Sequence, residues 1–188
     1  MSCAIIIHGA IGSGKTCTCL GLLERAVNEG VSVRGVLSQR VFEADELIGY
    51  NGLDPESGLS FPLVRLKTRV KCSGWSSLSN PKYAFSIEGF KRANMILNRS
   101  AYTMSRSSFV FVDEFGRLES KKGGIYPGAL AVAKALIVGG AAIFACRTNL
   151  VEEVLSLVSG RARIVYVYEP GHLEPIWRRV RGCLDRAV

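Results

Sequence analysis

Short, nearly uninterrupted apolar runs alternate along the chain with longer segments in which apolar residues recur every three or four positions. Such runs are typical of strands buried on both faces, and the longer segments are typical of helices. We predict buried strands over Cys3–Ile7, Phe109–Val112, Ala141–Cys146 and Ile164–Tyr168. We predict helices over Lys15–Asn28, Ser86–Met104, Pro127–Val138 and Leu150–Val158. This alternation predicts a mostly parallel α/β sheet with helices on both faces.

The pattern changes between the first and second predicted helices. Val31–Gln39, Leu47–Asn51 and Leu63–Val70 are short strand-like runs separated by Gly, Pro, Asn and Asp, which predicts antiparallel hairpins. Cys72–Lys82, rich in Ser, Gly and Asn, is predicted to be a loop. We find no internal repeat and no domain boundary, so residues 1–188 are predicted to form a single domain with an antiparallel hairpin extension.

The charge is strongly positive, with 24 basic and 16 acidic residues and a net charge of +8. This suits an anionic ligand and leaves nucleic acid possible, although no nucleic-acid recognition motif is present. Part of the excess lies in Arg65, Lys67, Arg69 and Lys71, which would share one face of a strand and point to nucleotide, nucleic acid or solvent. A second basic group lies in the C-terminal tail, at Arg178, Arg179, Arg181 and Arg186.

No apolar run approaches the length of a membrane span, and the N-terminus lacks the features of a signal peptide. We therefore predict a cytoplasmic protein without a membrane contact. The six cysteines are scattered and show no metal-binding spacing, so we predict reduced, mostly buried thiols.

Gly9–Thr16 fits the pattern G-x-x-x-x-G-K-[ST], which is the P-loop. A predicted strand precedes it and a predicted helix follows, and this context is typical of a phosphate site at a helix N-terminus. Lys15 is expected to reach the β- and γ-phosphates, and Thr16 to ligate Mg²⁺. The predicted nucleotide-binding residues are Gly9, Ala10, Ile11, Gly12, Ser13, Gly14, Lys15, Thr16 and Cys17.

A second motif follows the apolar run Phe109–Val112. Asp113 emerges at the carboxyl end of this strand, the edge where parallel sheets bind ligands, and is predicted to hold Mg²⁺ directly or through water. Glu114 can orient or deprotonate an attacking water, which favours a hydrolysing, RecA-like P-loop protein over a kinase. Glu114 could instead only cap the turn or pair with Arg117. If Glu114 is structural, Glu119 is the next candidate for positioning the water.

Other motifs are missing. No N-K-x-D segment occurs, which disfavours a guanine-specific GTPase, and no L-S-G-G-Q segment occurs, which disfavours an ABC ATPase. Arg147 follows the strand predicted to neighbour the P-loop strand, so it is a candidate for stabilising charge in the transition state. Arg117 is a second candidate, and either residue could instead be a surface arginine.

Asp113-Glu114-Phe115-Gly116-Arg117-Leu118-Glu119 resembles the D-E-[IF]-G-x-[ML]-E segment of the small nucleoside-triphosphatase family of P-loop enzymes found in thermophilic prokaryotes and in animals. The segments Arg34–Gln39, Ile48–Tyr50 and Phe61–Arg65 resemble further segments of that family. The resemblance implies a RecA-like fold and Mg²⁺-dependent hydrolysis of ATP, GTP and other nucleoside triphosphates with little base selectivity. Arg117 and the polar segment Ser120–Gly124 depart from the family pattern.

Three functions are therefore compared. The first is nucleoside-triphosphate hydrolysis, with Lys15, Glu114 and one of Arg147 and Arg117 as catalytic residues, and Thr16 and Asp113 at the metal. The second is a P-loop nucleotide or nucleic-acid kinase, which would need an acceptor pocket and a mobile basic lid. The third is an ATP-gated nucleic-acid-binding module. The pattern leaves the oligomeric state and the physiological substrate open.

Overall fold

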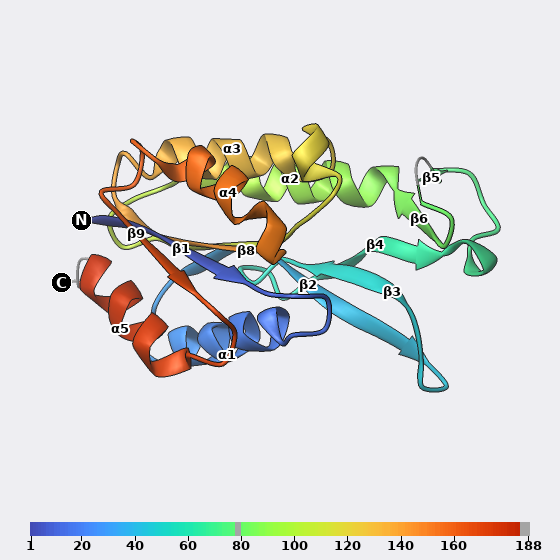
Figure 1. The fold of residues 1–188 in the computed structure, drawn as a ribbon, viewed down its shortest axis with the longest axis horizontal. Coiled ribbons are helices and arrows are strands. Elements are labelled where there is room, and N and C mark those ends of the chain that lie inside the picture. The colour runs from blue at the N-terminus through green and yellow to red at the C-terminus, as the bar shows by residue number, and fades with distance from the viewer. Residues whose placement is uncertain (78–79, 185–188) are drawn as a thin grey trace.

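The computed structural model describes residues 1–77 and 80–184 of the chain. These residues form a nine-stranded sheet with helices packed on both faces, as Figure 1 shows. The strand order is β5-β6-β4-β3-β2-β7-β8-β1-β9. The predicted α/β class is confirmed, and the antiparallel extension belongs to the same sheet as the parallel strands.

One side of the sheet consists of parallel strands: β2 (Val33–Glu43), β7 (Phe109–Phe115), β8 (Gly140–Cys146), β1 (Ser2–His8) and β9 (Ile164–Tyr168). The four predicted strands are all present, and β7 extends three residues beyond the predicted end. The predicted burial of β9 is wrong, because β9 lies at the edge of the sheet and none of its residues is buried. Strand β8 lies between β1 and β7, as predicted for the neighbour of the P-loop strand. The carboxyl ends of these strands therefore meet along one edge, where parallel sheets bind ligands.

Helices cover both faces of the parallel strands (Figure 1). Helices α1 (Lys15–Asn28) and α5 (Leu173–Cys183) lie on one face, and α2 (Ile87–Tyr102), α3 (Tyr126–Ala135) and α4 (Val151–Val158) lie on the other. Strand β1 supplies both cores, because Ile5 and Ile7 pack with α1 and α5 while Ala4 and Ile6 pack toward the opposite helices. Both faces of β1 are covered, which explains its uninterrupted apolar run.

The helix boundaries agree with the pattern where a cap or a glycine ends the periodicity. Helix α1 occupies the predicted residues, and Ser86 caps α2 by accepting a hydrogen bond from the Gly89 N–H at 3.0 Å. Helix α5 was not predicted, because the C-terminal segment was interpreted only as a basic tail. It buries Ile176, Trp177 and Val180 against the sheet. Arg186 lies outside the described residues.

The other side of the sheet is antiparallel, built from β3 (Glu46–Leu53), β4 (Ser60–Leu66), β6 (Tyr83–Ser86) and β5 (Trp75–Ser76). The predicted hairpins are confirmed. The predicted loop Cys72–Lys82 is partly wrong, because it contains the short strand β5; residues 78 and 79 of that segment lie outside the described residues.

The predicted basic face is wrong, because β4 ends at Leu66 and Lys67–Arg69 form a 3₁₀ helix, η1. The guanidinium of Arg65 donates to the Tyr50 carbonyl at 2.9 Å and to Asn51 Oδ1 at 2.6 Å. Arg69 pairs with Glu43 at 3.0 Å. These two cations are committed to holding the hairpins together and do not present a continuous basic stripe.

Two further predictions concern membrane-spanning segments and the burial of the cysteines. Within the described part of the chain, no helix is both long and apolar enough to cross a membrane. All six cysteines are free thiols, and only Cys17 and Cys72 are exposed. The predicted mostly buried thiols are therefore confirmed, and the cytoplasmic location stays a prediction.

Candidate functional site

The P-loop connects the end of β1 to the first turn of α1. Gly12 and Gly14 have φ angles of +84° and +95°, which lets the backbone turn tightly before the helix begins at Lys15. The Lys15 ammonium donates to the carbonyls of Gly9 at 2.9 Å and Ala10 at 2.8 Å, so it lies across the opening of the loop. A cation and a helix N-terminus thus meet at one point, which is an arrangement suited to anionic phosphates.

The remaining predicted P-loop residues contribute chiefly through their backbone. The side chains of Ile11 and Cys17 are exposed and do not build the loop interior. The Ser13 N–H donates to the Ala10 carbonyl at 3.2 Å, which closes the turn. The structure thus brings Gly9 to Cys17 together as one strand–turn–helix unit, as predicted.

Asp113 meets the P-loop across the sheet edge. The Thr16 hydroxyl donates to Asp113 Oδ2 at 3.1 Å, and the Ser38 N–H of β2 donates to the same oxygen at 3.0 Å. Asp113 is only 2% exposed. Burial, and then the nearby Glu114 carboxylate, raise the pKa of Asp113 well above its usual range.

This pair fits a magnesium ion. A hydroxyl and a single carboxylate, completed by waters and phosphate oxygens, are the ligands that Mg²⁺ takes in nucleotide sites. A bound cation would also compensate the buried charge of Asp113. No group of three or more His, Cys, Asp or Glu residues that could hold a metal occurs among the described residues. A metal at this pair would be held by Thr16, Asp113 and the phosphate oxygens of a bound ligand.

Glu114 projects from an irregularity in β7. The register with β8 shifts between Val112 and Phe115, and Glu114 adopts a left-handed φ of +69° that non-glycine residues rarely take. Its N–H donates to Asp113 Oδ1 at 2.9 Å, and its side chain is exposed while Asp113 and Phe115 are buried. The bulge separates two adjacent carboxylates, turning one inward to the metal pair and one outward. Strained backbone of this kind is characteristic of functional sites.

Glu119 has a structural role that the pattern alone did not reveal. Its side chain is buried, and its two oxygens accept hydrogen bonds from the Gly116 N–H at 2.8 Å and the Ile125 N–H at 2.9 Å. An ideal Cβ at Gly124, where φ is +58°, would lie 1.9 Å from Glu119 Oε1, so only glycine fits there. Glu119 therefore organises the loop after Glu114. Both of its oxygens are engaged, so it is not available to position water.

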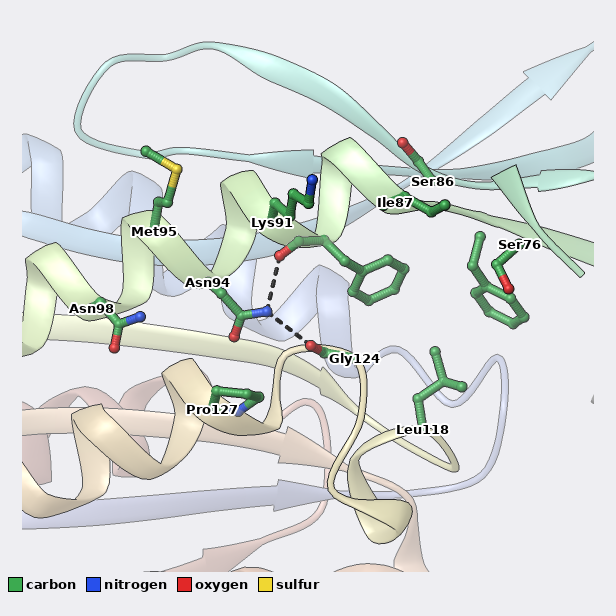
Figure 2. A pocket seen from close by; sticks show the side chains of 12 residues that line it. Ser76, Ser86, Ile87, Lys91, Asn94, Met95, Asn98, Leu118, Gly124 and Pro127 are labelled. Carbon is green, nitrogen blue, oxygen red and sulfur yellow. Dashed lines mark hydrogen bonds between the residues drawn. The ribbon is translucent and has the colours of Figure 1, made fainter. Parts of the chain in front are cut away.

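An open groove of about 590 Å³ lies behind this loop, beside α2 (Figure 2). The Asn94 amide donates to the Gly124 carbonyl at 2.8 Å and accepts from the Gly128 N–H at 2.9 Å. Leu118 and Pro127 line the same groove. Residues of the P-loop are not among those that line this groove, so it is separate from the phosphate site. The Asn94 contacts show that α2 fixes the loop that follows β7.

The two arginines proposed for the transition state have different surroundings. Arg147 is partly buried and follows β8 directly, next to the end of β1. Burial and the Glu114 carboxylate raise the pKa of the Tyr50 hydroxyl, and the positive charge of Arg147 lies near enough to oppose this rise. Arg117 is exposed on the loop after Glu114. The catalytic roles of both residues stay predictions.

Comparisons with known proteins agree with this geometry. The sequence pattern of the NTPase family matches residues 4–136, which include the P-loop, the hairpins and Asp113. The chain belongs to the NTPase family. A member from Methanopyrus kandleri, named nucleoside-triphosphatase THEP1, is 27% identical over 117 residues. That alignment covers 62% of this chain and 59% of the relative. The chain therefore spans less than two thirds of the length of this relative.

Two solved structures share the fold over nearly the whole chain. The solution structure of a human cancer-related nucleoside triphosphatase gives a TM-score of 0.66 at 18% identity, covering 96% of this chain and 95% of that one. The crystal structure of THEP1 from Aquifex aeolicus gives 0.65 at 16% identity, covering 98% and 99%. These likenesses establish the P-loop fold.

Proposed function

We propose that this chain hydrolyses nucleoside triphosphates to nucleoside diphosphates and phosphate, with Mg²⁺ as its cofactor. The observation that carries the proposal is the meeting of Thr16 and Asp113 at 3.1 Å beside an exposed carboxylate. Membership of the NTPase family supports the same reaction.

Binding is assigned to the P-loop. Backbone N–H groups of Gly9–Thr16 would donate to phosphate oxygens, and the Lys15 ammonium would exchange its two loop carbonyls for the terminal phosphates. Thr16 and Asp113 would hold Mg²⁺, which when bound supplies positive charge to the phosphate oxygens. These contacts address the triphosphate, which every nucleotide shares, so we propose weak selectivity among bases.

The chemical step needs a positioned water. Its oxygen forms a bond to the γ-phosphorus, the bond from that phosphorus to the β–γ bridging oxygen breaks, and one water proton passes to a base. Glu114 is proposed as this base or as the group that orients the water, because its carboxylate points away from the metal pair. Lys15 offsets charge that develops on the phosphate oxygens.

The two alternatives receive less support. A kinase would need a mobile basic lid, and the segment proposed for it, Arg65–Lys71, holds Arg65 and Arg69 in hydrogen bonds and ion pairs. The same contacts weaken the case for a nucleic-acid-binding module. A nucleic-acid partner is therefore not proposed, and a cytoplasmic location, where nucleotides are abundant and thiols stay reduced, is proposed with the activity.

The test is phosphate release from ATP, GTP, CTP, UTP and the deoxynucleotides, measured with Mg²⁺ and with or without RNA. We expect turnover of all of them without any acceptor, and no stimulation by RNA. Tight binding of every nucleotide without phosphate release would contradict hydrolysis. Transfer of the γ-phosphoryl group to an added nucleoside or nucleic acid would instead support the kinase alternative.

A further inference from the structure

We propose that Arg40, on the β2–β3 hairpin, is the arginine that stabilises the transition state from within the same chain. The inference rests on the proposed function and adds a catalytic residue to it.

The hairpin begins at the metal pair and continues past it. Strand β2 pairs in parallel with β7 only from Val33 to Val36, and the next residues leave β7 to pair with β3. Ser38 lies at this departure, where its N–H donates to Asp113. Arg40 is two residues further along the strand and therefore lies on the same face as Ser38. The hairpin is thus anchored at the site by its backbone before it reaches Arg40.

The guanidinium of Arg40 lies against the P-loop. An ideal Cβ built on Gly12 would be 3.6 Å from Arg40 Nη2, so the guanidinium lies close to the outer turn of the loop. Directly across the hairpin, Arg40 pairs in register with Tyr50. The Tyr50 hydroxyl lies within electrostatic range of Glu114, Arg40 and Arg147 together. The hairpin therefore places Arg40 beside the phosphate loop and Tyr50 within electrostatic range of the Glu114 carboxylate.

Arg40 differs from the neighbouring arginines in its partners. Among the described residues, its guanidinium makes no hydrogen bond or ion pair, and its side chain is exposed. Other arginines of the hairpins are engaged: Arg65 holds backbone carbonyls, Arg69 pairs with Glu43, and Arg34 donates to Thr103 Oγ1 at 2.7 Å. A cation with five donors, set against a phosphate loop without a protein partner, is suited to bind phosphate oxygens.

The chemistry gives Arg40 a specific task. As the bond to the β–γ bridging oxygen breaks, negative charge grows on that oxygen and spreads over the equatorial oxygens of the γ-phosphoryl group. A planar guanidinium can donate to two of these oxygens at once through parallel N–H groups, whereas the Lys15 ammonium acts as a compact point charge. Arg147 and Arg117 were the arginines predicted from sequence order. Arg147 also lies at the P-loop, because the Gly9 N–H donates to the carbonyl of the preceding residue, Cys146, at 3.3 Å. Among the described residues, however, the guanidinium placed beside Gly12 is that of Arg40.

The experiment compares Arg40→Ala and Arg40→Lys with the parent and with Arg69→Ala. Arg69 belongs to the same hairpin region and pairs with Glu43 and Glu46, so its loss tests loosening of the hairpin alone. We expect Arg40→Ala to lower kcat by about 10²- to 10³-fold, as removal of one preorganised donor does, with KM within about threefold of the parent. Arg40→Lys should recover only part of the rate, and Arg69→Ala should stay close to the parental kcat.

Two further measurements separate catalysis from binding. Arg40→Ala should bind ADP with parental affinity but lose affinity for the ADP–aluminium fluoride transition-state mimic by a factor comparable to its loss in kcat. Guanidinium ion at millimolar concentration should restore part of its rate, whereas the same concentration of sodium chloride should not.

The outcomes distinguish a failure of the proposed hydrolysis from a failure of the role assigned to Arg40. A parent that releases no phosphate from any triphosphate overturns the proposed function and this inference with it. An active parent whose Arg40→Ala variant keeps a kcat within about tenfold overturns the inference alone. An equal loss for Arg69→Ala, or a loss in Arg147→Ala but not in Arg40→Ala, also overturns it.

Discussion

At the scale of single residues, adjacent positions in this chain have opposite environments. Asp113 is buried and hydrogen-bonded on both carboxylate oxygens, whereas Glu114 is exposed on a left-handed backbone. The left-handed backbone of Glu114 lies within the irregularity of β7, where the register with β8 shifts between Val112 and Phe115. Adjacent carboxylates that differ this much in burial are suited to different tasks, one at a metal and one at a water.

We expect Lys15→Ala to abolish hydrolysis and to weaken triphosphate binding strongly. The ammonium contributes charge to the bound state and to the transition state, so KM and kcat should both deteriorate. Lys134→Ala is a suitable control, because Lys134 is exposed on α3. Nucleotide-binding titration and phosphate release measure the two effects. Parental turnover in Lys15→Ala would place the catalytic site elsewhere.

Glu114→Gln should separate binding from chemistry. The amide nearly preserves the shape of the carboxylate but removes the basicity that water activation uses. Mg²⁺ and ATP should still bind with near-parental affinity, while single-turnover hydrolysis falls by at least ~10²-fold, the usual size of a general-base contribution.

Asp113→Asn is the matched comparison for that variant. It changes the carboxylate that Thr16 and Ser38 contact, so both metal affinity and rate should fall. If Glu114→Gln hydrolyses ATP at the parental rate, Glu114 is structural and another group positions the water. Glu119 is excluded from that role by its two backbone hydrogen bonds.

At the scale of elements, the loop after β7 is fixed from two sides. Glu119 binds the N–H groups of Gly116 and Ile125. Asn94 of α2 binds the same loop at Gly124 and also binds Gly128 in the first turn of α3. The polar segment Ser120–Gly124 is therefore folded around a buried carboxylate, with a 3₁₀ helix at Glu119–Lys121. This explains why a glutamate and a glycine are needed at these positions, a point that the motif alone left unexplained.

Glu119→Gln should destabilise the protein by roughly 1–3 kcal/mol, since a side-chain NH₂ would then face one of the two backbone N–H donors. Urea unfolding measures the change, with the exposed Glu24→Gln on α1 as the control. Burial raises the pKa of Glu119, so the protonated form is favoured by folding. The stability from this group is therefore present at acidic pH and lost as pH rises through its folded pKa. The gap between parent and variant should narrow over that rise. An unchanged midpoint for Glu119→Gln would refute its anchoring role.

The elements differ in how far the sequence could predict them. Strand β1 and helix α1 were predictable, because burial on both faces gives an apolar run and a P-loop fixes where the helix begins. The end of β4 and the turn at Lys67–Arg69 were not, because alternating charges look alike in a strand and in a short 3₁₀ helix. Helix α5 was hidden by its arginines, although Ile176, Trp177 and Val180 have helical spacing.

The residues of the candidate site were also predictable only in part. The residues of the P-loop and Asp113 were predictable, since their chemistry requires particular residue types at fixed spacing. Ser38 contributes a backbone N–H, which any residue type carries, so no sequence signal marks it. Arg40 lies 24 residues after Thr16 on a hairpin whose path over the loop depends on where β2 leaves β7. Only the tertiary structure relates such a position to the phosphate site.

At the scale of the whole molecule, one sheet joins the parallel strands that carry the phosphate site and the antiparallel hairpins beside it. The parallel strands bring Thr16 and Asp113 to a common edge, and the antiparallel hairpins extend from β2 beside that edge (Figure 1). Because β2 belongs to both parts, the hairpin that carries Arg40 is covalently and sterically tied to the strand that contacts Asp113. The molecule therefore holds a phosphate loop, a metal pair and a covering hairpin within a single sheet.

The whole-molecule prediction concerns cofactor and substrate range. Turnover should require Mg²⁺ or Mn²⁺ and stop when EDTA is added, because Thr16 and Asp113 supply only part of a coordination sphere that a hydrated hard cation completes. Rates for ATP, GTP, CTP and UTP should lie within about a hundredfold of one another in kcat/KM, roughly 2.7 kcal/mol. The reason is that the assigned contacts are to phosphates and that no N-K-x-D segment is present to read guanine.

The controls for this prediction use binding as well as rate. Each triphosphate with Mg²⁺ should raise the thermal midpoint of the parent, since a ligand that binds only the folded state stabilises it. Asp113→Asn should lose much of the additional shift that Mg²⁺ gives with ATP, because a neutral amide is a weaker ligand for Mg²⁺ than a carboxylate. Full activity in EDTA, or a preference above a hundredfold for one base, would show that the phosphates and Mg²⁺ do not dominate recognition.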